Sequence, residues 1–201
     1  MKSGNRWKDH YTERAKNEKW LARSVYKLEE IDKKYKIIRK GNHILDLGCY
    51  PGSWSQYCIK MVGAGGQVVG LDKTKPNRLT AIHFRFLEAD ILRIKTGWLR
   101  HQVGRMDGVI SDLAPQTTGI RDVDTSRSLE LAERALEIAM AVLKDNGYFL
   151  CKVFEGEGFK TFKDQVSRHF RRTRSVRPSA IRKRSTEIYL LGIGFIELYG
   201  G

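Results

Sequence analysis

The sequence predicts an α/β protein in which helices cover both faces of a mainly parallel sheet. Short apolar segments typical of strands alternate with amphipathic segments typical of helices along the 201-residue chain. Polar residues also follow the ends of successive predicted strands, where parallel sheets bind their ligands. The length suits one domain. We expect that domain to span residues 24–201 and to follow a basic, aromatic arm at residues 1–23.

The arm mixes lysine and arginine with tryptophan and tyrosine. This mixture suits RNA, whose phosphates attract cations and whose unpaired bases stack on aromatic rings. A solvated, partly frayed arm explains the composition equally well. A helix should follow, with Ser24 as its N-cap and Gly41 after its end. Its apolar stripe contains Val25, Leu28, Ile31 and Tyr35, and by spacing alone Lys27 is an ordinary lysine beside that stripe.

The stretch from His43 to Tyr57 combines a strand, a glycine loop and a helix start. The strand covers residues 43–47, the loop begins at Gly48, and Ser53 should be the N-cap of the helix. Glycine lets the backbone approach a ligand, and a helix start offers free N–H groups. Because Cys49 follows Gly48, the spacing is not that of a dinucleotide fingerprint. S-adenosylmethionine (SAM), an adenosine cofactor without phosphate, fits better; a turn that binds nothing is the alternative.

Acidic residues end several of the later strands. Asp72 lies 24 residues after Gly48, near the offset of roughly 20 residues at which an acid binds a ribose in doubly wound folds. Asp90 either caps a helix or lies beside an adenine ring. Asp112 ends another strand, although an aspartate before a proline turn is often only a turn residue. The strands after the first should cover 67–72, 84–87, 106–113, 148–154 and 187–195, and the helices 91–103, 125–144 and 159–170.

Lys152 lies inside the apolar segment 148–154. Burying a lysine is costly unless its charge is paired or lost, so this residue is the strongest single candidate for a functional role. Lys152, Gly48, Asp72, Asp90 and Asp112 all fall at or near the carboxyl ends of predicted strands. Since these ends meet at one edge of a parallel sheet, the five residues predict one site.

The formal charge of +14 indicates a polyanionic partner, and nucleic acid fits better than a membrane. No acid occurs between Gln165 and Thr186, where arginines are frequent. Phosphate contacts explain this basic tract better than a solvated face does. No apolar run approaches the roughly 18 residues of a membrane span, so we expect a cytoplasmic protein. Scattered cysteines and histidines predict no metal site. No apolar segment is left over, which favours a monomer.

Several motifs, taken in order, resemble those of the FtsJ-type RNA ribose 2′-O-methyltransferases. They are ARSVYKLEEID, LDLGCYPGSWSQY, ISDLAPQTTG, KVFEGEGF and RSTEIYLLGIGF, and together they span nearly the whole chain. The resemblance implies a Rossmann-like SAM-dependent methyltransferase fold with seven strands, one of them a closing antiparallel strand. It also implies a catalytic tetrad, which the motifs assign to Lys27, Asp112, Lys152 and Glu187.

The same resemblance implies SAM contacts from Gly48, Gly52 and Trp54 in the loop, and from Asp72, Asp90 and Asp112. Cys49-Tyr50 stands where relatives often have two small residues. This difference bears on the detailed geometry of the loop and not on the choice of cofactor. The compact length favours large-subunit ribosomal RNA as the acceptor, with transfer RNA as the alternative, and the resemblance implies uridine as the base. A small-molecule methyltransferase would not need the basic tract, and a non-catalytic RNA-binding module would not need the tetrad.

Overall fold

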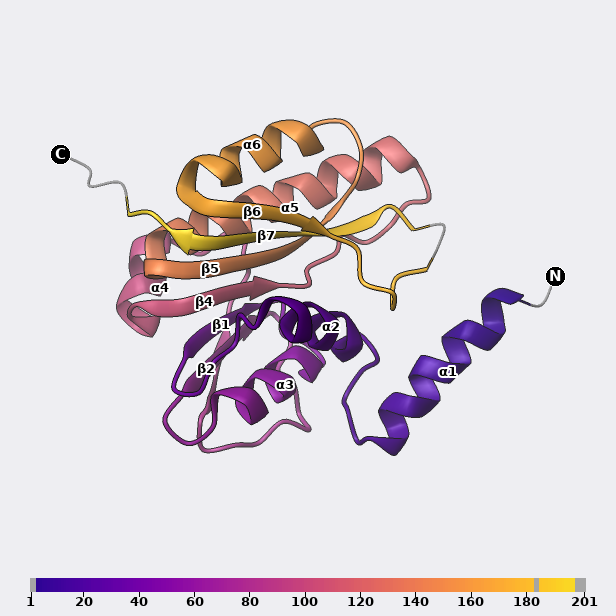
Figure 1. Cartoon of the computed structure of the whole chain (residues 1–201), viewed down its shortest axis with the longest axis horizontal. Coiled ribbons are helices and arrows are strands. Elements are labelled where there is room, and N and C mark those ends of the chain that lie inside the picture. The colour runs from indigo at the N-terminus through magenta and orange to yellow at the C-terminus, as the bar shows by residue number, and fades with distance from the viewer. Residues whose placement is uncertain (1–2, 183–184, 198–201) are drawn as a thin grey trace.

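The computed structural model describes residues 3–182 and 185–197, with side chains from residue 10 onward. Its centre is a seven-stranded sheet of order β3-β2-β1-β4-β5-β7-β6 (Figure 1). The first five strands are parallel to one another, and β7 runs antiparallel between β5 and β6. The strands are β1 His43–Leu47, β2 Gln67–Asp72, β3 Phe84–Glu88, β4 Met106–Ser111, β5 Leu143–Phe154, β6 Phe170–Val176 and β7 Glu187–Phe195.

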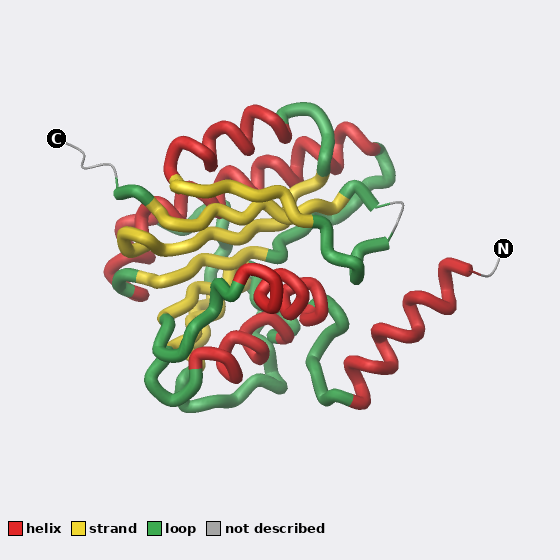
Figure 2. The backbone as a smooth tube through the Cα atoms, viewed as in Figure 1, coloured by secondary structure: helices red, strands yellow, loops and turns green. Residues whose placement is uncertain are grey.

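Helices cover both faces of the sheet, as Figure 2 shows. One apolar cluster joins the sheet to α2 and α3, and a second joins its other face to α4, α5 and α6. Neighbouring residues of β1 belong to different clusters, Ile44 to the first and Leu45 to the second, because side chains alternate along a strand. The helices are α1 Ser3–Asn17, α2 Val25–Tyr35, α3 Ser53–Val62, α4 Thr96–Val103, α5 Arg121–Val142 and α6 Phe159–His169.

The strand order places a topological switch point beside β1. This strand pairs with β2 on one side and with β4 on the other, so the connections after β1 and after β4 leave toward opposite sides. Open α/β sheets bind ligands at this kind of switch point, outside the carboxyl ends of the strands. The fold class expected from the sequence is therefore confirmed, including its seven strands.

The helix predicted at 125–144 differs from α5 at both ends. It begins four residues earlier, at Arg121, because the Asp124 carboxylate accepts hydrogen bonds from the backbone of Thr118 and Gly119 at 2.7 and 3.1 Å. These bonds fix the polar loop against the first turn of the helix. At the other end the chain becomes extended at Leu143, where β5 begins, five residues before the predicted strand.

The helix predicted at 91–103 is wrong over residues 91–95, since α4 begins only at Thr96. The main-chain carbonyls of Ile91 and Ile94 accept hydrogen bonds from the Arg134 guanidinium instead of from a helix. Ile91 and Ile94 are nevertheless buried. Their helix-like spacing in the sequence therefore reflects a buried turn and not a helix.

β6 was not predicted, because its sequence FRRTRSV was interpreted only as a basic tract. It is the edge strand, and its apolar anchors are the buried residues Phe170 and Val176 at its two ends. Charged side chains are common on edge strands because they discourage pairing with a further strand. A closing strand of this composition has a weak strand pattern of its own.

Ser24 and Ser53 do not act as the predicted N-caps. Neither α2 nor α3 has a side-chain capping hydrogen bond. The two hydroxyl oxygens instead lie 3.0 Å apart, and the Ser24 carbonyl accepts a hydrogen bond from the Trp54 indole at 3.0 Å. The two serines thus tie the start of α2 to the start of α3.

Candidate active site

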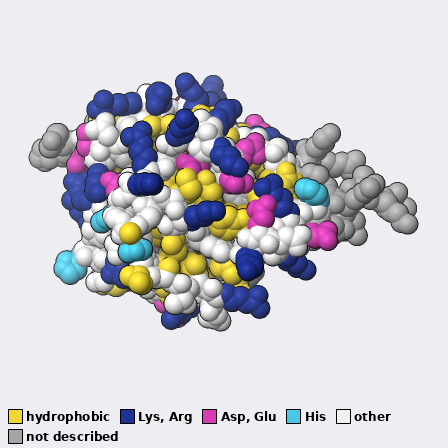
Figure 3. Space-filling view, turned by 60° about the horizontal axis from the view of Figure 1, so that its bottom comes forward, with side chains coloured by type: hydrophobic (Ala, Val, Ile, Leu, Met, Phe, Trp, Pro, Cys, Tyr) yellow, Lys and Arg dark blue, Asp and Glu magenta, His cyan; other side chains and the backbone are white. Residues whose placement is uncertain are grey.

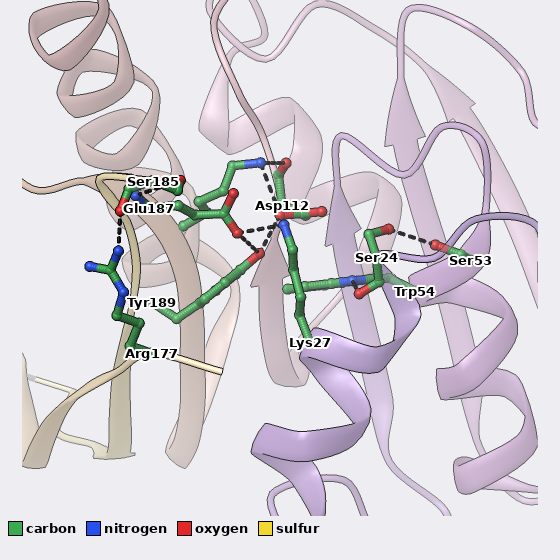
Figure 4. A network of polar contacts seen from close by, with 10 residues as sticks. Ser24, Lys27, Ser53, Trp54, Asp112, Arg177, Ser185, Glu187 and Tyr189 are labelled. Carbon is green, nitrogen blue, oxygen red and sulfur yellow. Dashed lines mark hydrogen bonds and ion pairs between the residues drawn. The ribbon is translucent and has the colours of Figure 1, made fainter. Parts of the chain in front are cut away.

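Four charged residues from distant parts of the sequence lie together at the carboxyl edge of the sheet (Figure 4). Lys27 lies in the first turn of α2, and Asp112 follows β4 directly. Lys152 belongs to β5, and Glu187 is the first residue of β7. The antiparallel pairing of β5 with β7 sets Phe154 opposite Glu187 and Lys152 opposite Tyr189. The structure therefore brings together all four residues of the predicted tetrad.

Two ion pairs hold these residues. Lys27 Nζ lies 2.5 Å from Glu187 Oε1, and Lys152 Nζ lies 2.9 Å from Asp112 Oδ1. The Lys152 ammonium also donates to the main-chain carbonyl of Asp112 at 2.6 Å. Only 6% of the Lys152 side chain is exposed, so its burial is compensated by these two acceptors. Lys27, which is an ordinary lysine by its sequence pattern, is half-buried and paired. Its partner Glu187 is 160 positions away, so the spacing within the helix could not reveal the pair.

Tyr189 links the two pairs and was missed from the sequence. Its hydroxyl lies 2.6 Å from Asp112 Oδ1 and 3.1 Å from Glu187 Oε1, and its single proton can be donated to only one of them at a time. Its ring packs on Trp54, with centroids 5.7 Å apart. The available signal was the spacing of two from Glu187, which puts both side chains on one face of β7. In the apolar run EIYLL, however, a tyrosine is typical of the core.

The electrostatics of the network favour an ionised aspartate. Burial by itself would raise the pKa of Asp112, but the ammonium groups of Lys152 and Lys27, with hydrogen bonds from Tyr189 and Lys152, outweigh burial and lower it. Burial and the neighbouring carboxylates of Asp112 and Glu187 raise the pKa of Tyr189, which therefore keeps its proton. The network therefore pairs two basic side chains with two acidic ones. Removing any one member leaves a charge without its partner.

The loop after β1 is held close to β2 by its backbone. The N–H groups of Gly48 and Cys49 donate to the Leu71 carbonyl at 2.8 and 3.3 Å. Gly48 has φ +75°, and a Cβ there would lie 2.4 Å from Leu113 Cδ2. Gly52 has φ +112°, and a Cβ would lie 2.9 Å from Leu21 Cδ1. Both glycines are therefore required by the backbone conformation as well as by the space around it.

The side chains of Asp72 and Asp90 are oriented by main-chain donors. Asp72 accepts hydrogen bonds from the N–H groups of Tyr50 and Thr74, each at 3.0 Å. Asp90 accepts from Leu92 N–H at 3.0 Å, so it caps a turn and not the helix expected from the sequence, which begins only at Thr96. Its other oxygen pairs with Lys73 at 2.9 Å, and this contact is the main reason for its lowered pKa. A role for either residue toward SAM stays a prediction.

Trp54 is almost fully buried. Its indole N–H donates to the Ser24 carbonyl, and its ring lies against Tyr189. The side chain therefore supports the junction of α2, α3 and β7. A contact of Trp54 with SAM stays a prediction.

Asp46 is a further candidate that the sequence did not single out. This residue of β1 has no exposed surface, its Oδ2 accepts a 2.6 Å hydrogen bond from Ser55, and its Oδ1 has no partner. Burial raises the pKa of Asp46 to about 7, and the charges of Asp112 and Asp72 contribute to the increase. Within a run reading HILDL, the acid was passed over as part of the strand. An acid in such a run is as costly to bury as the lysine of β5.

Other kinds of site find no support in the described part of the chain. Across residues 3–182 and 185–197, no cluster of histidine, cysteine and acidic side chains could hold a metal ion. No helix within these ranges is long and apolar enough to cross a membrane. Lys183 and Arg184 of the basic tract and Lys2 of the arm lie outside the described residues, as do the side chains of Arg6, Trp7 and Lys8.

The sheet order with β7 antiparallel, and a charged site at its carboxyl edge, define a Rossmann-like methyltransferase. Solved structures share this fold. The chain superimposes on a Plasmodium falciparum protein described as a ribosomal RNA methyltransferase with a TM-score of 0.77 and 25% identity, covering 88% of this chain and 98% of that one. Fibrillarin from Aeropyrum pernix, solved with bound SAM, has a TM-score of 0.63 at 17% identity, covering 85% and 76%.

Within this class, the chain belongs to the FtsJ-like methyltransferase family, whose model matches residues 20–195. It is 44% identical to the ribosomal RNA large subunit methyltransferase E of Desulfatibacillum aliphaticivorans, over 95% of this chain and 92% of the relative. It is 39% identical to the protein of that name from Methanothermobacter thermautotrophicus, over 96% and 94%. The resemblance inferred from the motifs is confirmed.

Proposed function

We propose that this protein transfers a methyl group from SAM to the 2′-hydroxyl of a ribose in large-subunit ribosomal RNA, with uridine as the base. The observation that best supports this reaction is the network of Lys27, Asp112, Lys152 and Glu187 beside the Gly48 loop. A ribose hydroxyl is a poor nucleophile until its proton is removed, and the network offers proton acceptors at the edge of the sheet. The names of the relatives support the choice of RNA.

The residues around the Gly48 loop fit SAM. The cofactor supplies a methyl group made electrophilic by a positively charged sulfonium. The carboxylates of Asp72 and Asp112 act electrostatically on Asp46, whose Oδ1 has no hydrogen-bond partner among the described residues. A cation is stabilised in such surroundings, whereas a phosphate would be repelled. Gly48, Gly52, Asp72 and Asp90 would hold the adenosine part, and Asp112 the methionine end.

Each residue of the network has a separate task in this reaction. Lys152 would accept the proton of the ribose hydroxyl at its Nζ atom, after transferring a proton to bulk water. Asp112 accepts hydrogen bonds from Lys152 Nζ through both its carboxylate and its main-chain carbonyl. These two contacts fix the amine in place. Glu187 fixes Lys27 through an ion pair, and the charge of Lys27 also acts on Asp112. Holding the hydroxyl in line with the methyl group contributes to the rate together with proton removal.

The RNA would lie along the basic edge of the sheet. Arg168, Arg171, Arg172 and Arg174 are exposed, and within the described part of the chain none forms an ion pair with an acid. β6 ends at Val176, beside the network, and Figure 3 shows lysine and arginine side chains spread over the face that it draws. Unpaired cations in a row favour a phosphate backbone as the partner.

The direct test is transfer of labelled methyl groups from SAM to purified large ribosomal subunits, free ribosomal RNA and transfer RNA in parallel. We expect label on the ribosomal material. Label only on transfer RNA would keep the reaction and replace the acceptor. If SAM binds but no RNA becomes labelled, the protein is an RNA-binding module and the proposal fails.

A further inference from the structure

A single glutamate of α2 holds the segment that connects β6 to β7. Glu30 accepts three hydrogen bonds from Ser179. The backbone N–H lies 3.0 and 2.8 Å from Oε1 and Oε2, and the hydroxyl donates to Oε2 at 2.6 Å. Hydrogen bonds to an ionised carboxylate are stronger than those between neutral groups. The contact therefore joins two parts of the chain that are 149 positions apart.

The same turn is anchored from below by apolar packing. Pro178, Ala180 and Ile181 are buried, whereas Ser179 between them is exposed. Ile181 N–H closes the turn by donating to the Pro178 carbonyl at 3.0 Å. Ala180 and Ile181 belong to the apolar cluster that contains α2. Apolar packing therefore fixes the buried side of the turn against α2, and the hydrogen bonds of Glu30 fix its exposed side.

The other end of the segment is also fixed. The Arg177 guanidinium donates to the Ser185 carbonyl, and Glu155 N–H donates to the Thr186 carbonyl at 2.8 Å. Glu187 of the catalytic network follows immediately. A shift of the turn would therefore change where the exposed Arg182 lies, while the packing of β7 on β5 keeps Glu187 in place.

The turn leads into Arg182, whose charge acts on Arg23. Burial and the charge of Arg182 lower the pKa of Arg23, and the carboxylate of Glu187 acts in the opposite direction. A hollow of about 120 Å³ is lined by Tyr11, Arg23, Ser24, Lys27 and Ala180, so it joins the turn to the catalytic lysine. Like charges repel, so holding Arg182 near Arg23 costs free energy, and a further anion beside them would lower that cost. The turn on Glu30 opposes that repulsion, and an RNA phosphate would relieve it.

We propose that Glu30 and Ser179 are positioning residues, which hold Arg182 near Arg23 so that a phosphate beside the methylated ribose is bound next to Lys27. This inference rests on the proposed function, because it assigns one contact of the RNA at that site. Glu30 lies three positions after Lys27 on the same side of α2, and the hydrogen bonds that it accepts within the described part of the chain come from the turn. It acts on the substrate through the turn and through Arg182.

The test compares Glu30→Ala, Glu30→Gln and Ser179→Ala with Glu29→Ala, a matched control. Glu29 lies on the same helix and pairs with Lys33 at 2.9 Å, whereas Ser179 of the turn bonds to Glu30. With ribosomal substrate at low salt, Glu30→Ala should raise KM for RNA by about tenfold, as expected for losing a hydrogen bond to a charged group. We expect kcat and the affinity for SAM to change little. Ser179→Ala should have a smaller effect in the same direction, and Glu30→Gln should recover most of the affinity because one acceptor oxygen remains.

Two further readouts separate positioning from general destabilisation. The amides of residues 177–182 should exchange hydrogen faster in Glu30→Ala than in Glu29→Ala. Adding Glu30→Ala to Arg182→Ala should raise KM no further, because both changes remove the same phosphate contact. An unchanged KM in Glu30→Ala, additive effects in the double variant, or an equal loss of SAM affinity would overturn the proposal. If Glu30→Ala fails to fold, Ser179→Ala and Glu30→Gln decide.

The outcome is independent of the reaction itself. Should the wild-type protein methylate no RNA, the proposed function fails, and direct binding of an RNA oligonucleotide to the same variants still tests the role of Glu30. Weaker binding by Glu30→Ala than by Glu29→Ala would then support the positioning role, and equal binding would contradict it.

Discussion

At the scale of single residues, Lys152 decides whether the charged network performs chemistry. Lys152→Ala removes the group that would accept the ribose proton, and general base catalysis typically contributes a factor of about 10² to 10⁴. We expect kcat to fall by at least about 100-fold, with SAM affinity nearly unchanged. Single-turnover methyl transfer and calorimetric SAM binding measure the two effects. Lys160→Ala, which alters an exposed lysine of α6, is the control and should behave as wild type.

Asp46 predicts a dependence of stability on pH. Its pKa is about 7 in the folded protein against 3.8 ordinarily, so between these values the folded state binds a proton that the unfolded state has released. This group therefore stabilises the fold fully below pH 3.8, and the contribution is lost as pH rises toward 7. The loss amounts to about 1.4 kcal/mol per pH unit at most. Asp46→Asn, which cannot ionise, should lack it.

Urea unfolding of wild type and Asp46→Asn between about pH 4.5 and pH 7.5 measures this difference, which should grow in favour of the variant as pH rises. Parallel stability profiles for the two proteins would mean that Asp46 is not the group responsible. Ser55 can still donate to the amide oxygen of the asparagine, so the hydrogen bond itself is preserved.

The sequence predicted some of these residues better than others, for physical reasons. Lys152 was conspicuous because a lysine in an apolar run must be paired, and the structure supplies Asp112. Lys27 was not conspicuous from its helical spacing, since its partner Glu187 is brought to it only by β7; the family motifs were needed to select it. Tyr189 and Asp46 lie in apolar runs where they resemble core residues, and neither was predicted.

At the scale of elements, the loop between β1 and α3 depends on the left-handed conformation of Gly52. Gly52→Ala introduces a Cβ at φ +112°, 2.9 Å from Leu21 Cδ1. We expect a loss of about 1–3 kcal/mol in the free energy of unfolding, together with weaker SAM binding. Chemical denaturation and calorimetry measure the two quantities.

Gly97→Ala is the matched control for this loop variant. A Cβ at Gly97 meets nothing within 4 Å, and the residue lies inside α4. Alanine is favoured over glycine in a helix by up to about 1 kcal/mol, so this variant should be as stable as wild type or more so. Equal stabilities of Gly52→Ala and wild type would contradict the requirement for glycine in the loop.

The accuracy of the predicted elements followed the strength of their local patterns. β1 and β2 were predicted to the residue, because each is a short apolar run bounded by glycine or a polar turn. The boundaries of α4 and α5 were displaced because tertiary contacts of Arg134 and Asp124 determine them. β6 has pairing partners only through β7, and nothing in FRRTRSV alone indicates that pairing.

At the scale of the whole molecule, the excess of 37 basic over 23 acidic residues should make RNA binding strongly dependent on salt. Replacing Arg171, Arg172 and Arg174 together by alanine should weaken RNA binding and reduce the slope of log K against log salt. Each lost phosphate contact should lower that slope by roughly 0.7–0.9. Filter binding over a salt series measures it.

The control for the arginine variant is Arg39→Ala with Lys40→Ala. Both residues are exposed and precede β1, so they lie at the edge of the sheet opposite the network. The control should leave the slope nearly unchanged although it removes positive charge. Equal slopes in the β6 variant and in the control would show that general charge, and not the β6 edge, binds the RNA.

The division at residue 24 between the arm and the domain stays a prediction. Most of the predicted arm forms the helix α1. In Figure 1 this helix extends away from the sheet. Its end is nevertheless tied to α2, because Arg14 lies over the Tyr26 ring at 4.2 Å and Glu18 accepts a hydrogen bond from the Tyr26 hydroxyl at 3.1 Å.

The measurement that tests the central claim most directly is the chemical position of the transferred methyl group. Ribosomal RNA labelled by the protein would be cleaved with alkali, which attacks through a free ribose 2′-hydroxyl. A 2′-O-methylated ribose blocks cleavage at its own phosphodiester, so the account predicts that the label is recovered in an alkali-resistant dinucleotide. Label recovered in mononucleotides, as a methylated base, would contradict it.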